Sequence, residues 1–476
     1  MYNILLKIDR DSSQPIYVQL ANEMIQLIRS GVLKPGTKLP SIRNMAKELD
    51  VHPRTVVAAY DEIAAQDWIC SKPRSGMIVA MNLPELKPIN FQSDTEQPAA
   101  KNIFSESHDT FRYKLIINDG FPDHRIAPFE QIMKYYKQAF YQNESEKMSM
   151  YSNSSGSFRL RKAFSAYLGE SRSLAVNMEN ILITRGAQMA IYLAASLLIK
   201  PGDEVLVGDP GYFLANAVFE QLGAKLTKIP VDQDGIDVDM IEKACKRKFK
   251  LLYIIPHHHH PTTVTLSAAR RMKLISLIKQ HQFKVIEDDY DYEFHYAHRP
   301  ILPLSSAEHD GHVLYIGSVT KSLISSMRMG YLIAPSELIS KATHHKQLMD
   351  IRGDLLFEDA LANLYENGTM QRHIRKSLKL YQQRRDIFCR LLKNEIGNEI
   401  SFKIPDGGMA VWVVFDKKYN LSELSSKAAR QGLRLSDGSL YNSSTANLNA
   451  VRMGFASLDE TEMIAIVAIL RKIMNV

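Results

Sequence analysis

One short segment of the chain, GSVTKSLISSMRMGY at residues 317–331, combines residue types that could do covalent chemistry on a phosphorylated ligand. It holds a single lysine, Lys321, with Ser318 and Thr320 just before it and Arg328 seven residues after it. A lysine amine attacks an aldehyde only when it is deprotonated and held in place. Hydroxyl groups and a guanidinium bind phosphate oxygens. The segment therefore fits a Schiff-base lysine beside a phosphate site, although any lysine in a loop could have such neighbours.

A second segment, VIEDDYDYEF at residues 285–294, places acids directly after an apolar strand. A pyridine ring that acts as an electron sink must stay protonated, which requires a carboxylate beside its nitrogen. Open α/β sheets bind ligands at the carboxyl ends of their strands. We therefore expect Asp288 to face the ring nitrogen of pyridoxal 5'-phosphate and Tyr290 to face the ring hydroxyl. The alternative is a solvated acidic loop.

Two further segments could complete such a pocket. In TRGAQ, the backbone N–H groups of Gly186, Ala187 and Gln188 stand between a strand and a helix, where a phosphate binds well. In GDPGYF, Tyr212 offers an aromatic ring that could stack on the cofactor.

The elements that must position these residues read as an α/β domain. Short apolar runs alternate with helical segments, which predicts a mostly parallel sheet covered by helices. These runs are ENILITRG, DEVLVGDP, AKLTKIPV, KLLYIIP, FKVIEDD and HVLYIGS. The later runs GGMAVWVVF and NAVRMGFAS indicate a smaller terminal α+β part.

The first 80 residues have a different organisation, that of a helix-turn-helix followed by two short strands. Pro53 opens the helix expected to read bases, and this helix should bury Val57, Tyr60 and Ile63. Side chains that could contact DNA are Arg43, His52, Arg54 and Thr55 around the helices, and Lys72 and Arg74 at the strand turn. A solvated basic surface explains any one of them alone, whereas their order along a helix–turn–helix–wing pattern favours DNA.

The composition of the chain limits the classes of protein to which it can belong. The chain has 476 residues and a formal net charge of +7, which permits nucleic-acid binding without requiring it. Cys70, Cys245 and Cys389 are widely spaced, so neither a disulfide framework nor a thiolate zinc site is expected. No apolar run is long enough to span a bilayer, and the N-terminus turns polar too early for a secretory signal. We expect a cytoplasmic protein without membrane contact.

The run GVLKPGTKLPSIRNMA and the later TVVAAY resemble the winged-helix head of GntR-family transcription regulators. Asp67 stands where that family usually has glycine before the wing. The rest resembles a fold-type I aminotransferase, and the combination resembles MocR/GabR-type regulators. The resemblance implies a winged helix at residues 1–80, a flexible linker at 81–112 and an aminotransferase-like, pyridoxal-phosphate-binding domain at 113–476.

The resemblance also assigns roles. It implies Lys321 as the Schiff-base lysine, Asp288 on the pyridine nitrogen, and Ser318 and Arg328 on the phosphate. Tyr151 would reach the phosphate across a homodimer interface, and the resemblance suggests heads swapped over the partner's body. Arg452 would receive the carboxylate of an amino-acid-like effector.

Several positions depart from the family pattern. Its PSHQYPTG is here PHHHHPTT, residues 256–263, so that His260 takes the position that holds the ring hydroxyl and Thr263 replaces a glycine. Adjacent histidines point different ways, so no metal site is expected. Leu214 stands where the GABA-responsive relative has an arginine, and Ala410 stands where many relatives carry histidine.

The sequence therefore predicts a regulator that binds double-stranded promoter DNA and senses an amine, an amino acid or the cofactor itself. The first alternative is a true aminotransferase with an appended DNA-binding domain. A DNA-binding protein with an empty body is disfavoured because Lys321, Asp288 and Arg328 are all present.

Overall fold

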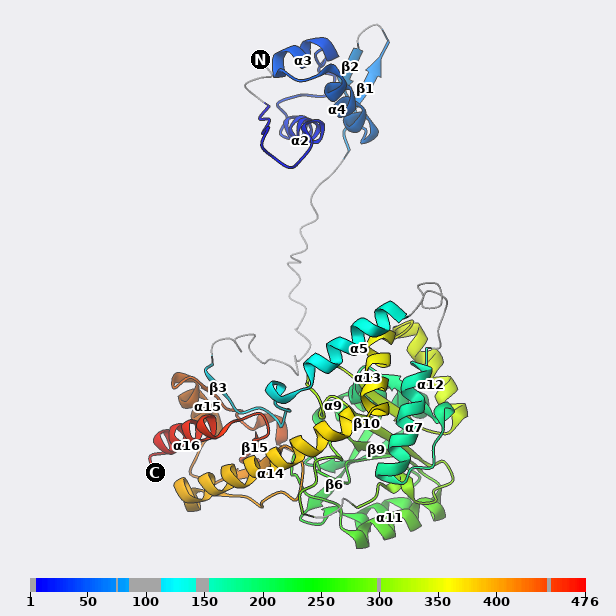
Figure 1. Cartoon of the computed structure of the whole chain (residues 1–476), viewed down its shortest axis with the longest axis vertical. Helices are drawn as coiled ribbons and strands as arrows, with labels where there is room; N and C mark the ends of the chain where they lie inside the picture. The colour runs from blue at the N-terminus through cyan, green and yellow to red at the C-terminus, as the bar shows by residue number, and fades with distance from the viewer. Residues whose placement is uncertain (1–5, 74–75, 85–112, 143–153, 298–300, 443–446) are drawn as a thin grey trace. The chain divides into compact units, whose positions relative to one another are not determined.

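The computed structural model describes residues 6–73, 76–84, 113–142, 154–297, 301–442 and 447–476. The chain divides into two compact units, Met1–Glu106 and Ser107–Val476, which are drawn in Figure 1. None of the described helices is both long and apolar enough to cross a membrane.

The first unit is a three-helix bundle followed by a hairpin. Helices α2, α3 and α4 span Ile16–Arg29, Ile42–Leu49 and Pro53–Ala65. Ser41 caps α3 by accepting a hydrogen bond from the N–H of Asn44. Strands β1 (Ile69–Lys72) and β2 (Gly76–Val79) pair antiparallel, and Lys38 bridges to Ile78 beside them. This is the predicted helix-turn-helix with a wing.

The predicted burial of Val57 is wrong. Helix α4 buries Val56, Ala59, Tyr60 and Ile63, whereas Val57 is 38% exposed. The buried positions follow the i, i+3, i+4, i+7 stripe of a helix, and Val57 lies one residue, about 100°, away from it.

The second unit is built on an eight-stranded sheet in the order β4-β11-β10-β9-β8-β5-β6-β7. Neighbours from β10 to β6 are parallel, while β11 runs antiparallel between β10 and β4. The strands span Ile181–Thr184 (β4), Glu204–Asp209 (β5), Lys225–Asp232 (β6), Gly235–Ile236 (β7), Leu251–Ile254 (β8), Lys284–Asp289 (β9), Val313–Ser318 (β10) and Gly330–Ile333 (β11). Six of them match the apolar runs of the sequence, and the edge hairpin strand β7 and the antiparallel β11 add to these.

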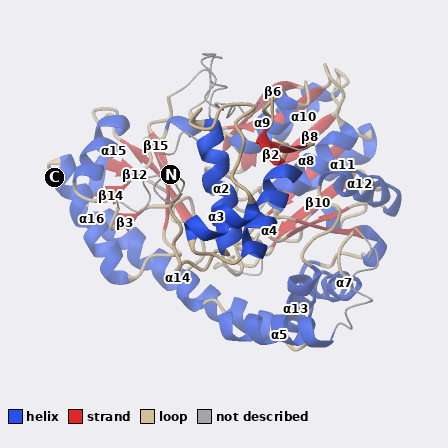
Figure 2. Ribbon diagram, turned by 90° about the horizontal axis from the view of Figure 1, so that it is seen from above, coloured by secondary structure: helices blue, strands red, loops and turns tan. Residues whose placement is uncertain are grey.

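Helices cover both faces of this sheet, as the blue ribbons around the red strands show in Figure 2. One core packs α8, α9 and α12 on the sheet, while the other face is covered by α10 and α11 and by α7 and α13. The helices around this sheet are α5 (Phe129–Gln142), α7 (Phe158–Arg172), α8 (Ala187–Leu198), α9 (Phe213–Gln221), α10 (Val238–Cys245), α11 (Ala268–His281), α12 (Ser336–Met349) and α13 (Leu355–Glu366).

A smaller α+β part ends the chain. Strands β12 (Ile400–Ser401), β13 (Ala410–Phe415) and β15 (Ala450–Gly454) form one sheet, and β14 (Leu433–Arg434) pairs with β3 (Leu115–Ile116). Helices α14 (Thr369–Glu395), α15 (Leu421–Arg430) and α16 (Glu460–Met474) pack on them in a separate core. The β3 pairing ties the first described segment of this unit to its last part, and the N–H of Gly454 donates to the carbonyl of Asn118, so residues near 120 lie beside residues near 450.

Candidate functional site

Lys321 follows strand β10 and is half-buried. Its Nζ donates a hydrogen bond to the carbonyl of Gly120 (2.5 Å) and lies 4.7 Å from the ring centroid of Phe121. Burial lowers the pKa of Lys321 to about 8. Near neutral pH a larger share of this amine is therefore uncharged and nucleophilic than in an exposed lysine.

Asp288 lies near the end of strand β9 and is 2% exposed. The hydroxyl of Tyr253 donates to its Oδ2 (2.7 Å), whereas its Oδ1 has no hydrogen-bond partner in the described chain. Burial raises the pKa of Asp288 to about 7. A buried carboxylate oxygen without a partner fits a protonated ring nitrogen, which would satisfy it and favour its charged form.

The start of helix α8 is held against strand β11. A Cβ atom at Gly330 would lie 2.6 Å from the carbonyl carbon of Gly186 and 2.8 Å from the nitrogen of Ala187. Gly186 has a φ of 82° and precedes the helix, and a Cβ there would lie 2.9 Å from Nη2 of Arg328. A guanidinium and a helix N-terminus therefore face the same point, which is an arrangement suited to a phosphate.

Other predicted pocket residues lie around these groups. Ser318 is nearly buried at the end of β10 and accepts a hydrogen bond from the N–H of Thr320. The side chain of Gln188 donates to the carbonyl of Leu214 (3.1 Å), and its Oε1 has no partner among the described residues. The rings of Tyr212 and His260 meet edge to face, with centroids 5.1 Å apart.

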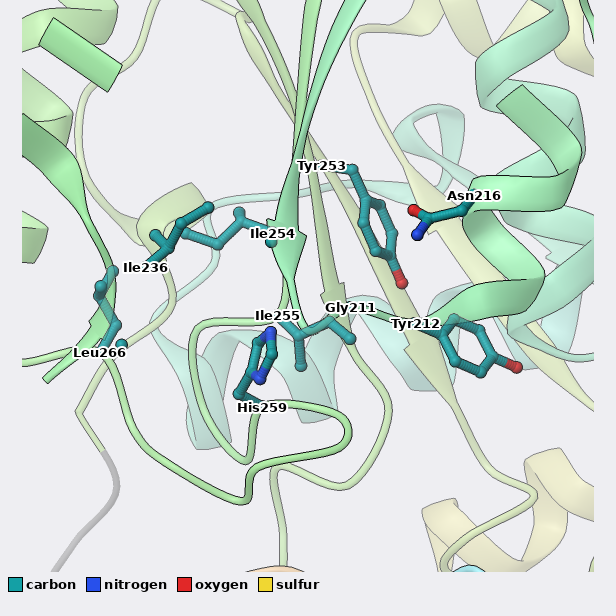
Figure 3. Close-up of a pocket in the computed structure, with 11 residues that line it drawn as sticks. Gly211, Tyr212, Asn216, Ile236, Tyr253, Ile254, Ile255, His259 and Leu266 are labelled. Carbon is teal, nitrogen blue, oxygen red and sulfur yellow. The ribbon is translucent and has the colours of Figure 1, made fainter. Parts of the chain in front are cut away.

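A small cavity of about 10 Å³, enough for roughly one water, lies beside Tyr212. Figure 3 shows Tyr212, Tyr253 and Asn216 on one side of strand β8, with Ile236 and Leu266 on the other. Oδ1 of Asn216 is buried there without a hydrogen-bond partner in the described chain.

The four consecutive histidines have four separate environments. His257 lies against Asp289, His258 against Asp291, His259 against Thr262 and His260 against Asp119. Among the described residues, no group of three or more histidine, cysteine or acidic side chains could hold a metal ion. Each of the four histidines thus makes a buried contact with a different residue.

The two histidines next to the pocket differ in their contacts. Burial lowers the pKa of both His259 and His260, that of His259 to about 3. His260 therefore donates its Nε2 proton to Asp119 while neutral, and its buried Nδ1 has no partner in the part of the chain described. That free acceptor fits a ring hydroxyl.

Arg452 on β15 is almost fully buried beside the pocket. Its guanidinium donates to the carbonyl of Pro261 (3.1 Å) and to the hydroxyl of Tyr290 (3.2 Å), and its Nε lies 3.2 Å from Oδ1 of Asp119. Tyr290 in turn donates to the carbonyl of His258 (2.8 Å). The structure thus brings the predicted residues Lys321, Tyr290 and Arg452 together.

In the first unit, Arg43, His52, Arg54 and Lys72 are exposed and Thr55 is half-buried. Nδ1 of His52 accepts a hydrogen bond from the N–H of Arg54 (3.2 Å), so that His52 caps helix α4. Arg54 and Thr55 lie in the first turn of that helix, and Arg43 lies in the first turn of α3. Arg74 and Tyr151 lie outside the described residues, and their roles stay predictions.

Comparison with known sequences assigns both units. The profile of aminotransferase class I and II matches residues 113–470, and that of the bacterial regulatory proteins of the gntR family matches residues 16–79. The chain belongs to the aminotransferase class I and II family. With the GntR domain at its start, it is a MocR-type transcription regulator, and pyridoxal phosphate is its implied cofactor. The predicted fold class is confirmed.

Individual relatives agree with this assignment. YdeL of Bacillus subtilis, described as an uncharacterized HTH-type transcriptional regulator, is 28% identical over 460 residues, which cover 96% of each chain. The probable rhizopine catabolism regulatory protein MocR of Rhizobium meliloti is 27% identical and covers 96% of this chain and 94% of its own. Kynurenine aminotransferase of Pyrococcus horikoshii, solved in complex with PMP, matches 77% of this chain and 92% of its own, with a TM-score of 0.70 at 24% identity.

The departures from the MocR pattern have local explanations. Thr263 and Asp67 stand at expected glycine positions and adopt left-handed φ values of 62° and 61°, so both turns are kept. A Cβ on Gly120 would lie 3.2 Å from the Cβ of Ala410, so this alanine packs directly under the loop that contacts Lys321. The carbonyl of Leu214 accepts a hydrogen bond from the side chain of Gln188, and nothing in the structure explains the leucine side chain at this position.

Sequence reasoning missed Tyr253, Asn216 and Asp119. A signal was available for Tyr253, because a tyrosine inside a buried strand usually needs a partner for its hydroxyl. Asp119 carried no comparable signal, since its partners Lys321 and Arg452 lie far away in the sequence.

Replacing Asp288 with asparagine tests the environment of this carboxylate in the cofactor-free protein. Its folded pKa of about 7 lies above the unfolded value of 3.8, so the folded state binds the proton more tightly. Wild-type stability should therefore fall as the pH rises from about 4 to about 7, and Asp288→Asn should remove that loss. The melting-temperature advantage of the variant should grow from pH 5 to pH 8. Asp310→Asn, at an exposed loop position, is the control, and a pH-independent difference would contradict the assignment.

Proposed function

We propose that the aminotransferase-like unit of this regulator senses an amine-bearing effector, or its cofactor, at Lys321 and changes the DNA binding of the winged helix. The observation that carries the proposal is the joint presence of two intact sites in one chain. Lys321 and Asp288 lie at the carboxyl ends of the neighbouring strands β10 and β9 and Arg328 lies beside the start of helix α8, while Arg54 and Thr55 lie in the first turn of the second helix of a helix-turn-helix. A free-standing aminotransferase would have no use for the second site.

The cofactor roles follow from the contacts. When bound, pyridoxal phosphate supplies an aldehyde that condenses with amines. Lys321 would offer the uncharged amine, and the free Oδ1 of Asp288 would hold the proton on the ring nitrogen. Tyr212 would lie against the ring, and His260 and Tyr290 would contact its hydroxyl. The phosphate would be held by Ser318, Arg328 and the N–H groups of Gly186, Ala187 and Gln188, together with Tyr151 of a second copy.

Regulation requires only a small energetic difference between two states. An effector that changes DNA affinity 5- to 150-fold needs a coupling free energy of about 1–3 kcal/mol. Movement of the smaller part around Arg452 against the large sheet is the two-state change that we propose.

Lys321→Ala should separate sensing from DNA binding. Borohydride should attach a pyridoxyl group to the Lys321 peptide of the wild-type protein and not of the variant. The variant should still bind the promoter DNA of its own gene, because its head is unchanged, but lose the response to amines and cofactor. Lys341→Ala, which removes an exposed lysine on α12, should keep the response. A Lys321→Ala protein that still responds would refute the proposal.

DNA recognition would use the start of α4, where side chains can reach base edges in the major groove. Arg43 and Lys72 would contact the duplex beside it, as would Arg74, while His52 would support the helix as its cap.

Arg54→Ala should weaken binding to the promoter by about 5- to 150-fold, since one base contact contributes roughly 1–3 kcal/mol. The measurement is a fluorescence-anisotropy titration at several salt concentrations. Arg29→Ala, at the exposed end of α2, is the matched control. Unchanged affinity of Arg54→Ala at moderate salt would overturn the assignment of α4.

We also propose a homodimer through the surface around α5. Exposed apolar side chains lie on α5 and at the C-terminal end of α12 and just beyond it: Met133, Phe140, Tyr141, Leu348, Met349 and Ile351. A pocket of about 690 Å³ between these helices is lined by Met133, Tyr136, Arg328 and Lys346 among others. A partner seated here would lie beside the phosphate end of the cofactor site.

Met133→Glu should convert the dimer to a monomer, or raise its dissociation constant at least about tenfold, because a charge would be buried in an apolar contact. Light scattering after size exclusion measures the mass. Met272→Glu places the same charge at an exposed position of α11 and should leave the dimer intact. A wild-type monomer at micromolar concentration would contradict this part of the proposal.

A further inference from the structure

The loop at residues 118–123 passes beside Lys321, whose Nζ donates to the carbonyl of Gly120, and is anchored at both ends. The side chain of Asn118 accepts hydrogen bonds from the N–H groups of Gly120 and Phe121, both at 2.9 Å, and donates to Ser457 (2.7 Å). Asp123 is held at the other end by Arg125 and Arg384. Asp119 therefore extends into the pocket from a backbone that is fixed on either side of it.

The carboxylate of Asp119 bridges the groups expected to receive ligand. Its Oδ2 lies 2.7 Å from Nε2 of His260. Its Oδ1 lies 3.2 Å from Nε of Arg452 and accepts a hydrogen bond from the hydroxyl of Tyr441 (3.1 Å). A ligand carboxylate at Arg452 would meet the same donors.

Access to Arg452 depends on this residue. The side chain of Arg452 is 1% exposed, whereas that of Asp119 is 38% exposed. Among the described residues, the guanidinium also donates to the carbonyls of Pro261 and Asp119 and to the hydroxyl of Tyr290. Asp119 is thus the partly exposed ion-pair partner of an otherwise covered guanidinium.

Asp119 is ionised. Burial opposes its charge, but His260, Arg452 and Lys321 outweigh burial and hold the pKa of Asp119 well below its usual range. The positive charge of Arg452 is therefore already compensated within the chain, and a second carboxylate placed there would meet like-charge repulsion from Asp119.

We propose that Asp119 is a tethered carboxylate that occupies Arg452, so that the pocket selects amines without an α-carboxylate over the corresponding α-amino acids. The inference rests on the proposed binding of amines at Lys321 and narrows their class. An amino acid must displace Asp119 from Arg452 and His260, whereas a simple amine leaves these contacts in place.

The test compares ligands that differ by one carboxylate on the full-length, cofactor-loaded protein. Calorimetric titrations use ethylamine, L-alanine, 2-phenylethylamine and L-phenylalanine, with propionate as a carboxylate that carries no amine. Wild-type protein should bind each amine more tightly than its amino acid and should bind propionate weakly. Asp119→Asn should tighten the binding of both amino acids and of propionate about tenfold or more, the range expected for a newly available charged hydrogen bond. Amine binding should change less than about threefold.

Three variants control the result. The gain should vanish in the double variant Asp119→Asn/Arg452→Ala, since the guanidinium is the site in question. Asp119→Ser is a second neutral variant should the asparagine protein fail to fold, and Glu423→Gln removes an exposed carboxylate of α15 without effect.

Two outcomes would overturn the inference. One is a wild-type protein that prefers the amino acids, and the other is a neutral variant that leaves amino acid and propionate affinities unchanged. Propionate binding does not involve Lys321, so that the propionate series still tests Asp119 if no amine binds. Failure of the amines alone would instead contradict the amine-sensing part of the proposed function and leave the sensing of the cofactor itself.

Discussion

The close contact between Gly330 and the start of helix α8 is the constraint on which the pocket depends. No space remains for even one methyl group between Gly330 and the Gly186–Ala187 peptide. Because Gly330 begins β11 and the preceding loop carries both Lys321 and Arg328, this contact fixes three things together. It sets the position of the N-terminus of helix α8, the position of the Arg328 guanidinium beside it, and the path of the loop that carries Lys321.

Burial then shifts the pKa values of Lys321 and Asp288 so that each group favours its neutral form. It lowers the pKa of Lys321 to about 8 and raises that of Asp288 to about 7. An uncharged amine and a carboxyl with one free oxygen are what the cofactor requires before it binds. Asp119 acts in the opposite sense, since its negative charge favours the protonated lysine and compensates Arg452. On the proposal made above, the selectivity of the pocket depends on a residue outside the aminotransferase motifs.

The fold could be predicted from the sequence because the patterns that indicate its helices and strands are local. The strand that carries Asp288 and the glycine before α8 follow from short patterns, and so does the helix that begins at Pro53. Val57 was misplaced because a one-residue error in helical phase moves a side chain off the buried stripe. Asp119 and Tyr253 were missed because their partners come from distant segments, joined through the β3–β14 pairing and the parallel sheet. The residue roles in the pocket and on the winged helix stay predictions.

The central claim is that chemistry in the pocket changes DNA occupancy. One measurement tests it most directly: wild-type protein with labelled promoter DNA is incubated with amines, amino donors and a keto acid while the cofactor spectrum, product formation and DNA anisotropy are recorded together. The account predicts that a spectral change at the cofactor is accompanied by a change in DNA occupancy, with little turnover. Fast multiple turnover with DNA occupancy unchanged by any ligand or by the cofactor would contradict it and would identify the protein as an aminotransferase with an appended DNA-binding domain.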